Sequence, residues 1–101
     1  DLANWIPARL SIILIALARP RGARSAIREA KKYHSATPSP NSGWPMAAAA
    51  GSLKIRLEKP GQYILLGENP NPETRDIFRA TGLVQSAIAL TLAAAFICLL
   101  L

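Results

Sequence analysis

The chain has 101 residues, of which half are hydrophobic, 18% are charged and only one, Cys98, is a cysteine. This length allows one small domain at most, and a lone cysteine excludes an internal disulfide and a cysteine metal cluster. The hydrophobic residues gather in residues 10–18 and 83–101, and most charges lie between them. This distribution is typical of a membrane protein rather than of a globular one.

The first apolar segment, WIPARLSIILIALA, covers residues 5–18. Only residues 10–18 are uncharged and apolar, which is short for a span. Together with the preceding residues, 2–18 are predicted to form a membrane helix whose start tolerates Pro7. Arg9 would then lie at membrane depth, where a guanidinium either snorkels to the interface or faces a polar cavity and a substrate.

A basic segment, RPRGARSAIREAKK, follows at residues 19–32. Its six cations stand against Glu29 alone, so six minus one gives +5 of the net charge of +6. By the positive-inside rule, this charge predicts that residues 19–71 are cytoplasmic, between two apolar segments that cross the membrane in opposite directions. Residues 23–33 have the spacing of a helix with one small apolar stripe and one cationic stripe. The cationic stripe consists of Arg24, Arg28, Lys31 and Lys32.

This cationic stripe allows three uses. It could contact anionic lipids beside a membrane helix, bind nucleic acid, or neutralise a phosphorylated substrate. We expect no nucleic-acid partner, because the stripe is tied to a membrane and no nucleic-acid-binding fold is visible in the sequence.

The stretch TPSPNSGWPMAA, residues 37–48, is predicted to be a stiff polar loop that ends beside Trp44. Prolines fix φ at positions 38, 40 and 45, and Gly43 allows a close backbone approach. The polar side chains between them are Ser39, Asn41 and Ser42. A stiff loop loses little entropy on binding, so this pattern suits an anion or amide site, with a structured proline-rich connector as the alternative.

Residues 53–66 are predicted to form a β-hairpin, because apolar and charged residues alternate from Leu53 onward. Pro60 and Gly61 suit the central positions of a type II turn. A two-stranded hairpin is only marginally stable alone, so it must pack against the rest of the chain.

The last segment, residues 72–101, is predicted to be one long helix with Asn71 as its N-cap, Pro72 in its first position and Glu73 in its first turn. Its final 19 residues, 83–101, carry no charge. At about 1.5 Å per residue they nearly cross a hydrocarbon core of about 30 Å, so they predict a transmembrane helix.

General motifs identify no enzyme. The sequence has no GxxxxGK[ST] loop, no GxGxxG, no paired cysteines or histidines for zinc, and a single histidine, His34. The chain also begins at Asp1 without a basic leader or a cleavage site. We therefore expect a fragment that begins inside a longer protein.

Four stretches carry a family resemblance: NWIPARL (4–10), SPNSGWPMAAAAG (39–51), IRLEKPGQY (55–63) and DIFRATGLV (76–84). In this order they resemble the C-terminal part of the adenosylcobinamide-phosphate synthase family, the CbiB/CobD membrane proteins of cobalamin biosynthesis. The family often places a histidine directly before the proline that corresponds to Pro38. Here His34 lies further upstream, which leaves its role open.

The resemblance implies an ATP-dependent amide ligation. Adenosylcobyric acid would be joined to aminopropanol phosphate, or a related amino alcohol phosphate, to give adenosylcobinamide phosphate, with ATP and Mg²⁺ expected. An acyl phosphate would activate the corrin carboxylate for attack by the amine. The remaining helices of the longer protein would complete the site, so the isolated fragment is expected to be inactive.

With this reaction in mind, we expect substrate contacts from the cationic stripe, Arg9 and the 37–48 loop. The candidates are Arg9, Arg24, Arg28, Lys31, Lys32, Ser39, Asn41, Ser42, Gly43 and Trp44. Catalytic residues stay unassigned, with His34 as a weak candidate. The candidates for Mg²⁺ are Glu58, Glu68 and Asp76, each of which could instead be a surface charge.

The sequence therefore predicts a mainly α fragment of an integral cell-membrane protein. Two membrane helices, 2–18 and 72–101, would flank a cytoplasmic region with a basic helix, the loop and a small β-hairpin. The expected partners are the corrinoid, the amino alcohol phosphate, the lipid bilayer and the rest of the parent chain. One alternative is a non-enzymatic membrane hairpin whose basic loop binds anionic lipid or a protein. A transporter fragment would need more polar residues in its spans than Gln85, Ser86 and Thr91.

Overall fold

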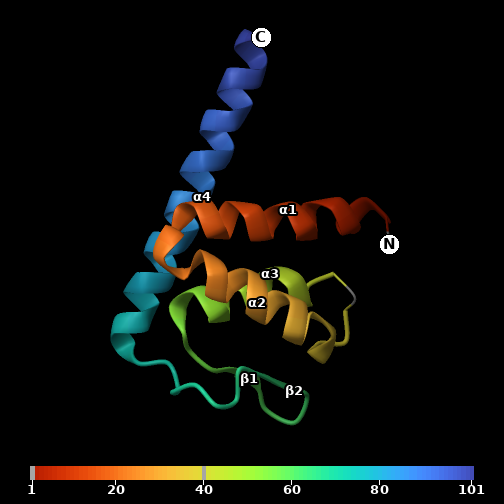
Figure 1. Ribbon diagram of the computed structural model, residues 1–101, viewed down its shortest axis with the longest axis vertical. Coiled ribbons are helices and arrows are strands. Elements are labelled where there is room, and N and C mark those ends of the chain that lie inside the picture. Colours follow the sequence, from red (N-terminus) through yellow and green to blue (C-terminus); the bar gives the residue numbers. More distant parts are fainter. Residues whose placement is uncertain (1, 40) are drawn as a thin grey trace.

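The computed structural model describes residues 2–39 and 41–101 and is mainly helical (Figure 1). Its elements are α1 (Leu2–Ala18), the 3₁₀ turn η1 (Pro20–Gly22), α2 (Ala23–Tyr33), the 3₁₀ turn η2 (His34–Ala36), α3 (Gly43–Leu53), β1 (Leu57–Lys59), β2 (Tyr63–Leu65) and α4 (Thr74–Leu100). The expected mainly α class with one small β-hairpin is confirmed. Pro40, one of the three prolines expected to stiffen the loop, lies outside the described residues.

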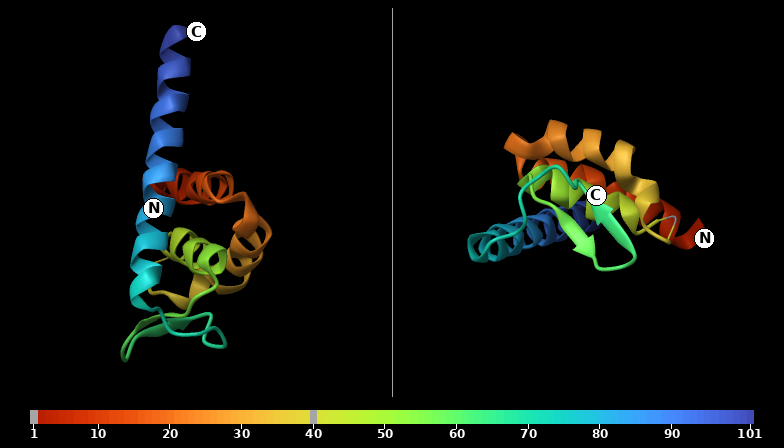
Figure 2. Two further views of the ribbon diagram at one scale, coloured as in Figure 1. Left: turned by 90° about the vertical axis from the view of Figure 1, so that its left-hand side faces the viewer. Right: turned by 90° about the horizontal axis from the view of Figure 1, so that it is seen from below.

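The two apolar helices do not run side by side. Figure 1 shows α1 crossing α4, and Figure 2 shows α1 and the α2–α3 pair on one side of the lower half of α4. Across residues 2–39 and 41–101, α4 alone is long and apolar enough to span a membrane. The expectation of two membrane helices is therefore corrected to one candidate span.

The length and contacts of α1 give the physical reason for this difference. Its 17 residues extend about 26 Å, less than a hydrocarbon core of about 30 Å. Ala8 and Ile15 are buried, and Ile15 belongs to the same apolar cluster as Leu83 of α4. One face of α1 is thus already used in packing against the rest of the protein.

Small residues bring α2 and α3 into close contact. The predicted small apolar stripe of residues 23–33 consists of Ala23, Ala26, Ile27 and Ala30. Ala26 and Ala30 are fully buried, as that stripe requires, whereas Ile27 stays exposed. A Cβ added to Gly51 of α3 would lie 2.7 Å from the carbonyl oxygen of Ser25. The close approach of the two backbones therefore depends on a glycine at position 51.

The helix α3 replaces the second half of the predicted 37–48 loop. It begins at Gly43 and places Pro45 in its first turn, where a missing N–H costs nothing. The alanine run that follows has the highest helix propensity of any residue type. The polar loop is therefore confined to residues 37–42, and Trp44 lies on a helix.

The same helix shortens the predicted hairpin. Leu53 ends α3, and Lys54 caps it with a left-handed φ of 58°, so the expected first strand is wrong before Leu57. β1 and β2 pair antiparallel with Leu57 opposite Leu65. The predicted type II turn is confirmed, because the N–H of Gln62 donates to Lys59 at 2.9 Å and Gly61 has a φ of 78°.

The start of α4 also differs from the prediction. The helix begins at Thr74, not Pro72, and Glu73 replaces Asn71 as the N-cap. Glu73 and Asp76 form a capping box, in which the Glu73 N–H donates to Asp76 Oδ2 at 2.8 Å. This reciprocal pair satisfies two backbone N–H groups at the helix start, which Asn71 alone would not do.

We predict that Gly51→Ala destabilises the protein by about 1–3 kcal/mol, because the added methyl group overpacks the α2–α3 contact. Thermal unfolding of the detergent-solubilised chain measures this loss. The matched control is Gly82→Ala on α4, where an added Cβ meets no atom within 4 Å. Equal effects of the two substitutions would contradict the close contact.

Candidate functional site

Arg9 of α1 connects two aromatic rings that are distant in sequence. Its guanidinium carbon lies 4.1 Å from the ring centroid of Trp5 and 4.9 Å from that of Trp44. The Trp44 ring stacks on His34, with centroids 3.9 Å apart and planes inclined by 7°. We call these four residues the Arg9 cluster.

The polar loop meets the Arg9 cluster through Asn41. Arg9 Nη1 donates to Asn41 Oδ1 at 3.4 Å and to the carbonyl oxygen of Trp5 at 3.2 Å. Asn41 is itself largely buried, although it is 32 residues from Arg9. Arg9 therefore contacts a polar side chain of the protein. The substrate-facing role that the sequence allows for Arg9 stays a prediction.

Hydrogen bonds within the loop fix its shape. The hydroxyl of Ser39 accepts from the backbone N–H groups of Asn41 and Ser42, each at 3.3 Å, and Thr37 Oγ1 donates to the Ser39 carbonyl at 3.1 Å. A Cβ at Gly43 would clash with the carbonyl group of His34. The expected close backbone approach at Gly43 is therefore present, and it is an approach to the protein's own chain.

A cavity of about 340 Å³ lies between α1 and this loop. We call it the α1–loop cavity; it is lined by Asn4, Pro7, Ala8, Ser11, Ser39, Asn41, Ser42 and Pro45. The NWIPARL and SPNSGWP stretches thus meet at one cavity. Five of the lining residues were not predicted as site residues: Asn4, Pro7, Ala8, Ser11 and Pro45. They lie within the two quoted stretches or directly after the first, which was the signal available in the sequence.

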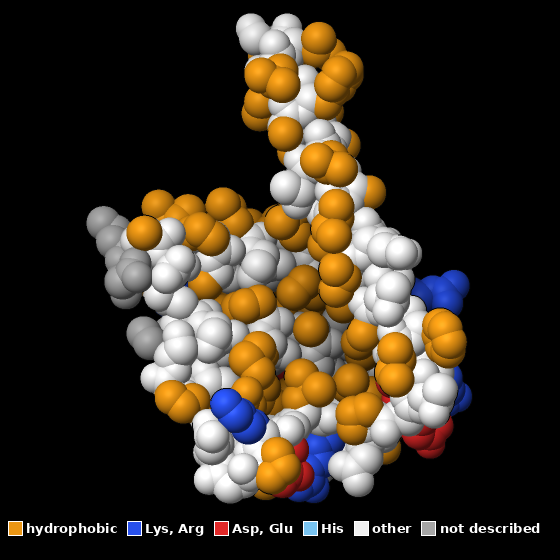
Figure 3. Space-filling view, turned by 180° about the vertical axis from the view of Figure 1, so that it is seen from behind, with side chains coloured by type: hydrophobic (Ala, Val, Ile, Leu, Met, Phe, Trp, Pro, Cys, Tyr) orange, Lys and Arg blue, Asp and Glu red, His pale blue; other side chains and the backbone are white. Residues whose placement is uncertain are grey.

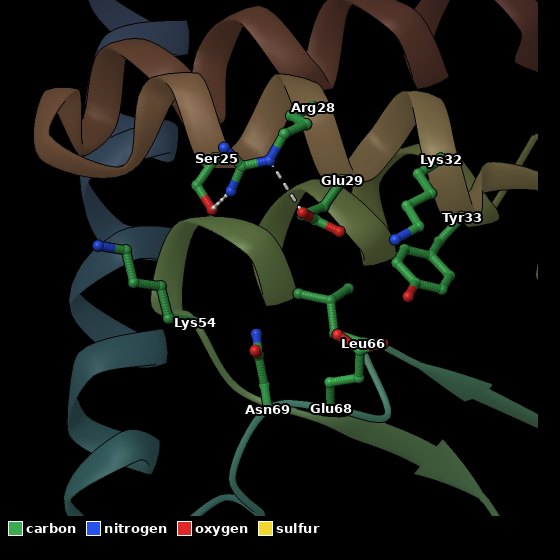
Figure 4. A pocket seen from close by; sticks show the side chains of 9 residues that line it. All are labelled: Ser25, Arg28, Glu29, Lys32, Tyr33, Lys54, Leu66, Glu68 and Asn69. Carbon is green, nitrogen blue, oxygen red and sulfur yellow. Dashed lines mark hydrogen bonds and ion pairs between the residues drawn. The ribbon is translucent and has the colours of Figure 1, made fainter.

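The cationic stripe of α2 is divided between two surfaces. Arg28 and Lys32 line a pocket of about 200 Å³ that also contains Lys54, which was not predicted as a site residue (Figure 4). Arg24 and Lys31 lie instead, together with Arg28, around a shallow hollow on the outer surface. The four cations therefore do not form one face toward a single ligand.

The pocket with Arg28, Lys32 and Lys54, which we call the basic pocket, also holds acidic groups. Glu29 accepts a hydrogen bond from Arg28 Nε at 3.0 Å, and Arg28 Nη2 donates to the hydroxyl of Ser25 at 3.4 Å. The other lining residues are Tyr33, Leu66, Glu68 and Asn69. Tyr33 directly precedes His34, so one end of the basic pocket adjoins the Arg9 cluster in sequence.

The three candidate ligands for Mg²⁺ lie apart. Glu58 on β1 pairs with Arg56 at 2.8 Å, and Asp76 on α4 pairs with Arg79 at 2.6 Å. Of the three candidates, Glu68 is the one that lines the pocket with Arg28, Lys32 and Lys54. Within the part of the chain that the structure describes, no three His, Cys, Asp or Glu side chains group as a metal site.

Trp44 also carries a buried polar atom. Its indole Nε1 is buried and has no hydrogen-bond acceptor among residues 2–39 and 41–101. A buried donor left unpaired costs about 1–3 kcal/mol. An acceptor oxygen from a ligand or from another protein segment at this position would remove that cost.

The Arg9 cluster predicts a measurable coupling between α1 and α3. The changes in the free energy of unfolding caused by Arg9→Gln and Trp44→Leu should not add up in the double variant. Thermal unfolding should give a coupling energy of about 0.5–2 kcal/mol, which comes from the lost cation–π contact. The control pair is Arg75→Gln with Trp44→Leu, because Arg75 is exposed at the start of α4 and pairs only with Glu73 among the ion pairs found in the described residues. Additive effects in the first pair would show that Arg9 and Trp44 do not support each other.

Several curated proteins of cobalamin biosynthesis are similar to this chain. A "Probable cobalamin biosynthesis protein CobD" from Methanothrix thermoacetophila is 52% identical over 90 residues, which are 89% of this chain and 28% of the relative. A protein of the same description from Aeropyrum pernix is 41% identical over 92 residues, 88% of this chain and 29% of the relative. The "Cobalamin biosynthesis protein CobD" of Rhodobacter capsulatus is 40% identical over 100 residues, 88% of this chain and 31% of the relative.

The chain thus spans less than a third of the length of these relatives. No solved structure matches it. The family model described as "CobD/Cbib protein" matches residues 1–96, which is nearly the whole chain. The chain therefore belongs to the CobD/CbiB family of cobalamin-biosynthesis proteins.

Proposed function

We propose that this chain forms part of the substrate site of an enzyme that joins adenosylcobyric acid to an amino alcohol phosphate with ATP. The observation that carries this proposal is the hydrogen bond from Arg9 to Asn41, 32 residues apart in sequence. Asn41 lines the α1–loop cavity, so this bond links Arg9 to the cavity wall. Arginine donors and an asparagine amide suit carboxylates and amides, the polar groups at the edge of a corrin ring.

Size limits what each cavity can hold. The α1–loop cavity, at about 340 Å³, lies at the low end of the range for drug-sized ligands, about 300–1,000 Å³. A whole corrinoid is larger than this, so the cavity would take one carboxylate or amide arm of the ring. The remaining length of the family's proteins would then surround the rest of the macrocycle.

The basic pocket suits the phosphate of the second substrate. Arg28 can contact phosphate oxygens with two donors at once, and Lys32 and Lys54 provide point charges. Its volume of about 200 Å³ matches a small amino alcohol phosphate better than a nucleotide. Glu29 and Glu68 leave it with one net positive charge, three cations minus two carboxylates.

In this proposal, the chain's own residues bind and orient the two partners. Asn41 and Ser42 would bind the corrin carboxylate in the α1–loop cavity and orient it toward the amine. Arg9 would add its charge from beside the cavity, through its hydrogen bond to Asn41. ATP would supply the phosphoryl group that activates the carboxylate, and this group would leave as inorganic phosphate when the amide bond forms. Mg²⁺ usually binds one or two carboxylates together with substrate phosphates, and Glu68 is the candidate ligand beside the basic pocket.

The helix α4 and the basic segment support a proposed membrane placement. With α4 as the span, residues 19–71 would lie on the cytoplasmic side, where ATP is available. In this proposal His34 would support the site as the stacking partner of Trp44.

We predict that Asn41→Ala and Arg28→Ala each reduce function in a full-length family member that carries this segment. The measurement is rescue of a corrinoid-auxotrophic strain that lacks the enzyme, grown on cobyric acid with cobinamide as the positive control. Each variant should lower turnover about tenfold or more, the effect of losing one or two charge-assisted or polar contacts to substrate. The control, Lys59→Ala, removes an exposed cation at the end of β1 and should rescue fully.

Normal rescue by both Asn41→Ala and Arg28→Ala, at equal protein levels, would contradict the assignment of these sites. Scrambling residues 37–45 at constant charge separates the enzyme from a lipid-binding membrane hairpin. Loss of rescue supports the substrate site, and full rescue supports the hairpin.

A further inference from the structure

The exposed face of α1 points toward the same side as the free half of α4. Four large apolar residues of α1 are more than half exposed: Ile6, Leu10, Ile13 and Leu17. At about 100° per residue they fall within one narrow stripe, opposite the buried residues Ala8 and Ile15. Figure 3 shows hydrophobic side chains along this edge of α1, on the side to which α4 extends.

This geometry sets the level of the membrane boundary on α4. Ile15 of α1 packs with Leu83, the first residue of the uncharged stretch 83–101. With α4 as the span, α1 would lie in the interface plane, its apolar stripe toward the acyl chains and its other face on the protein. The layer of lipid phosphates would then surround the residues close to this crossing.

A pocket of about 310 Å³ lies at that level, where the end of α1 meets α4. It is lined by Ala18, Arg19, Arg79, Gly82, Leu83 and Ser86. It is separate from both the α1–loop cavity and the basic pocket, which share no lining residue with it.

The two arginines of this pocket differ in their partners. Arg79 donates to Asp76 Oδ1 at 2.6 Å and to the carbonyl oxygen of Leu53 at 2.9 Å, so the protein already fixes its guanidinium. Arg19 Nη1 is buried and has no acceptor in the part of the chain that the structure describes. The Asp76 charge offsets one of the two cations, which leaves the pocket one net positive charge.

We propose that this pocket binds the phosphate of an anionic phospholipid head group. Arg19 would donate to the phosphate oxygens, Arg79 would add its charge from a fixed position, and the Ser86 hydroxyl would donate a further hydrogen bond. Anionic phospholipid is the source rather than free phosphate, because the pocket lies at the level of the interfacial helix.

The surface of α4 beyond the pocket fits the rest of such a lipid. Residues four, seven and eleven positions after Ser86 lie on the same face of a helix. These are Leu90, Ala93 and Ile97, all apolar. An acyl chain could therefore follow this face from the pocket into the hydrocarbon layer.

The test measures retention of phosphatidylglycerol by the purified, detergent-solubilised protein, using native mass spectrometry across a lipid titration. Arg19→Gln should weaken retention about tenfold, the effect of one charge-assisted hydrogen bond, and Ser86→Ala about three- to fivefold. The matched control is Arg21→Gln, which removes the same charge from an exposed position two residues away and should have little effect. Phosphatidylcholine serves as the lipid without net charge and should be retained more weakly.

Equal losses in Arg19→Gln and Arg21→Gln would overturn the proposal, since they would indicate general charge attraction only. Unchanged retention in both Arg19→Gln and Ser86→Ala would overturn it as well. Displacement of the lipid by millimolar inorganic phosphate would indicate a site for free phosphate instead. The corrinoid reaction is not involved in these readouts, so the outcome is independent of the proposed enzyme function.

Discussion

The contact of Arg9 with Trp44 and Asn41 joins the two halves of the candidate site. A guanidinium in an apolar helix costs free energy unless its charge is compensated and its N–H groups find acceptors. Here the guanidinium makes cation–π contacts with the indole rings of Trp5 and Trp44. The Asn41 side-chain oxygen and the Trp5 carbonyl oxygen accept hydrogen bonds from its Nη1. Because Arg9 of α1 contacts both Asn41 of the loop and Trp44 of α3, it helps to position the loop that lines the α1–loop cavity.

A second constraint is the close packing of α2 against α3. Alanine and glycine at the contact bring these helices together, and this fixes the backbone of Gly43 against His34. The polar loop is therefore held at both ends, by η2 before it and by α3 after it. Such a loop is preorganised, and this favours binding because the loop loses little conformational entropy when a ligand binds.

The sequence predicts several elements well because their signals are local. An uncharged run of 19 residues identifies the apolar half of α4, and Pro60 with Gly61 identifies the turn between β1 and β2. The direction of α1 could not be predicted, because it depends on tertiary contacts of Ala8 and Ile15. The helix start at Gly43 was not predicted, because proline and glycine usually indicate a loop, although the alanine run after them favours a helix.

The site shows the same division between local and tertiary information. The two stretches NWIPARL and SPNSGWP are visible in the sequence, but their meeting at Arg9 and Asn41 is a property of the fold. Lys54 could not be identified because it joins the basic pocket only through the left-handed end of α3. The split of the cationic stripe likewise depends on which side of α2 the hairpin region covers.

The most direct test of the central claim is the affinity of a full-length family member for adenosylcobyric acid. The protein would carry Arg9→Gln, Asn41→Ala or both, and binding would be measured by calorimetry. We predict that each single variant weakens binding. The loss of binding free energy in the double variant should be clearly smaller than the sum of the two single losses, because the two residues act as one unit. Unchanged affinity in both single variants would contradict it.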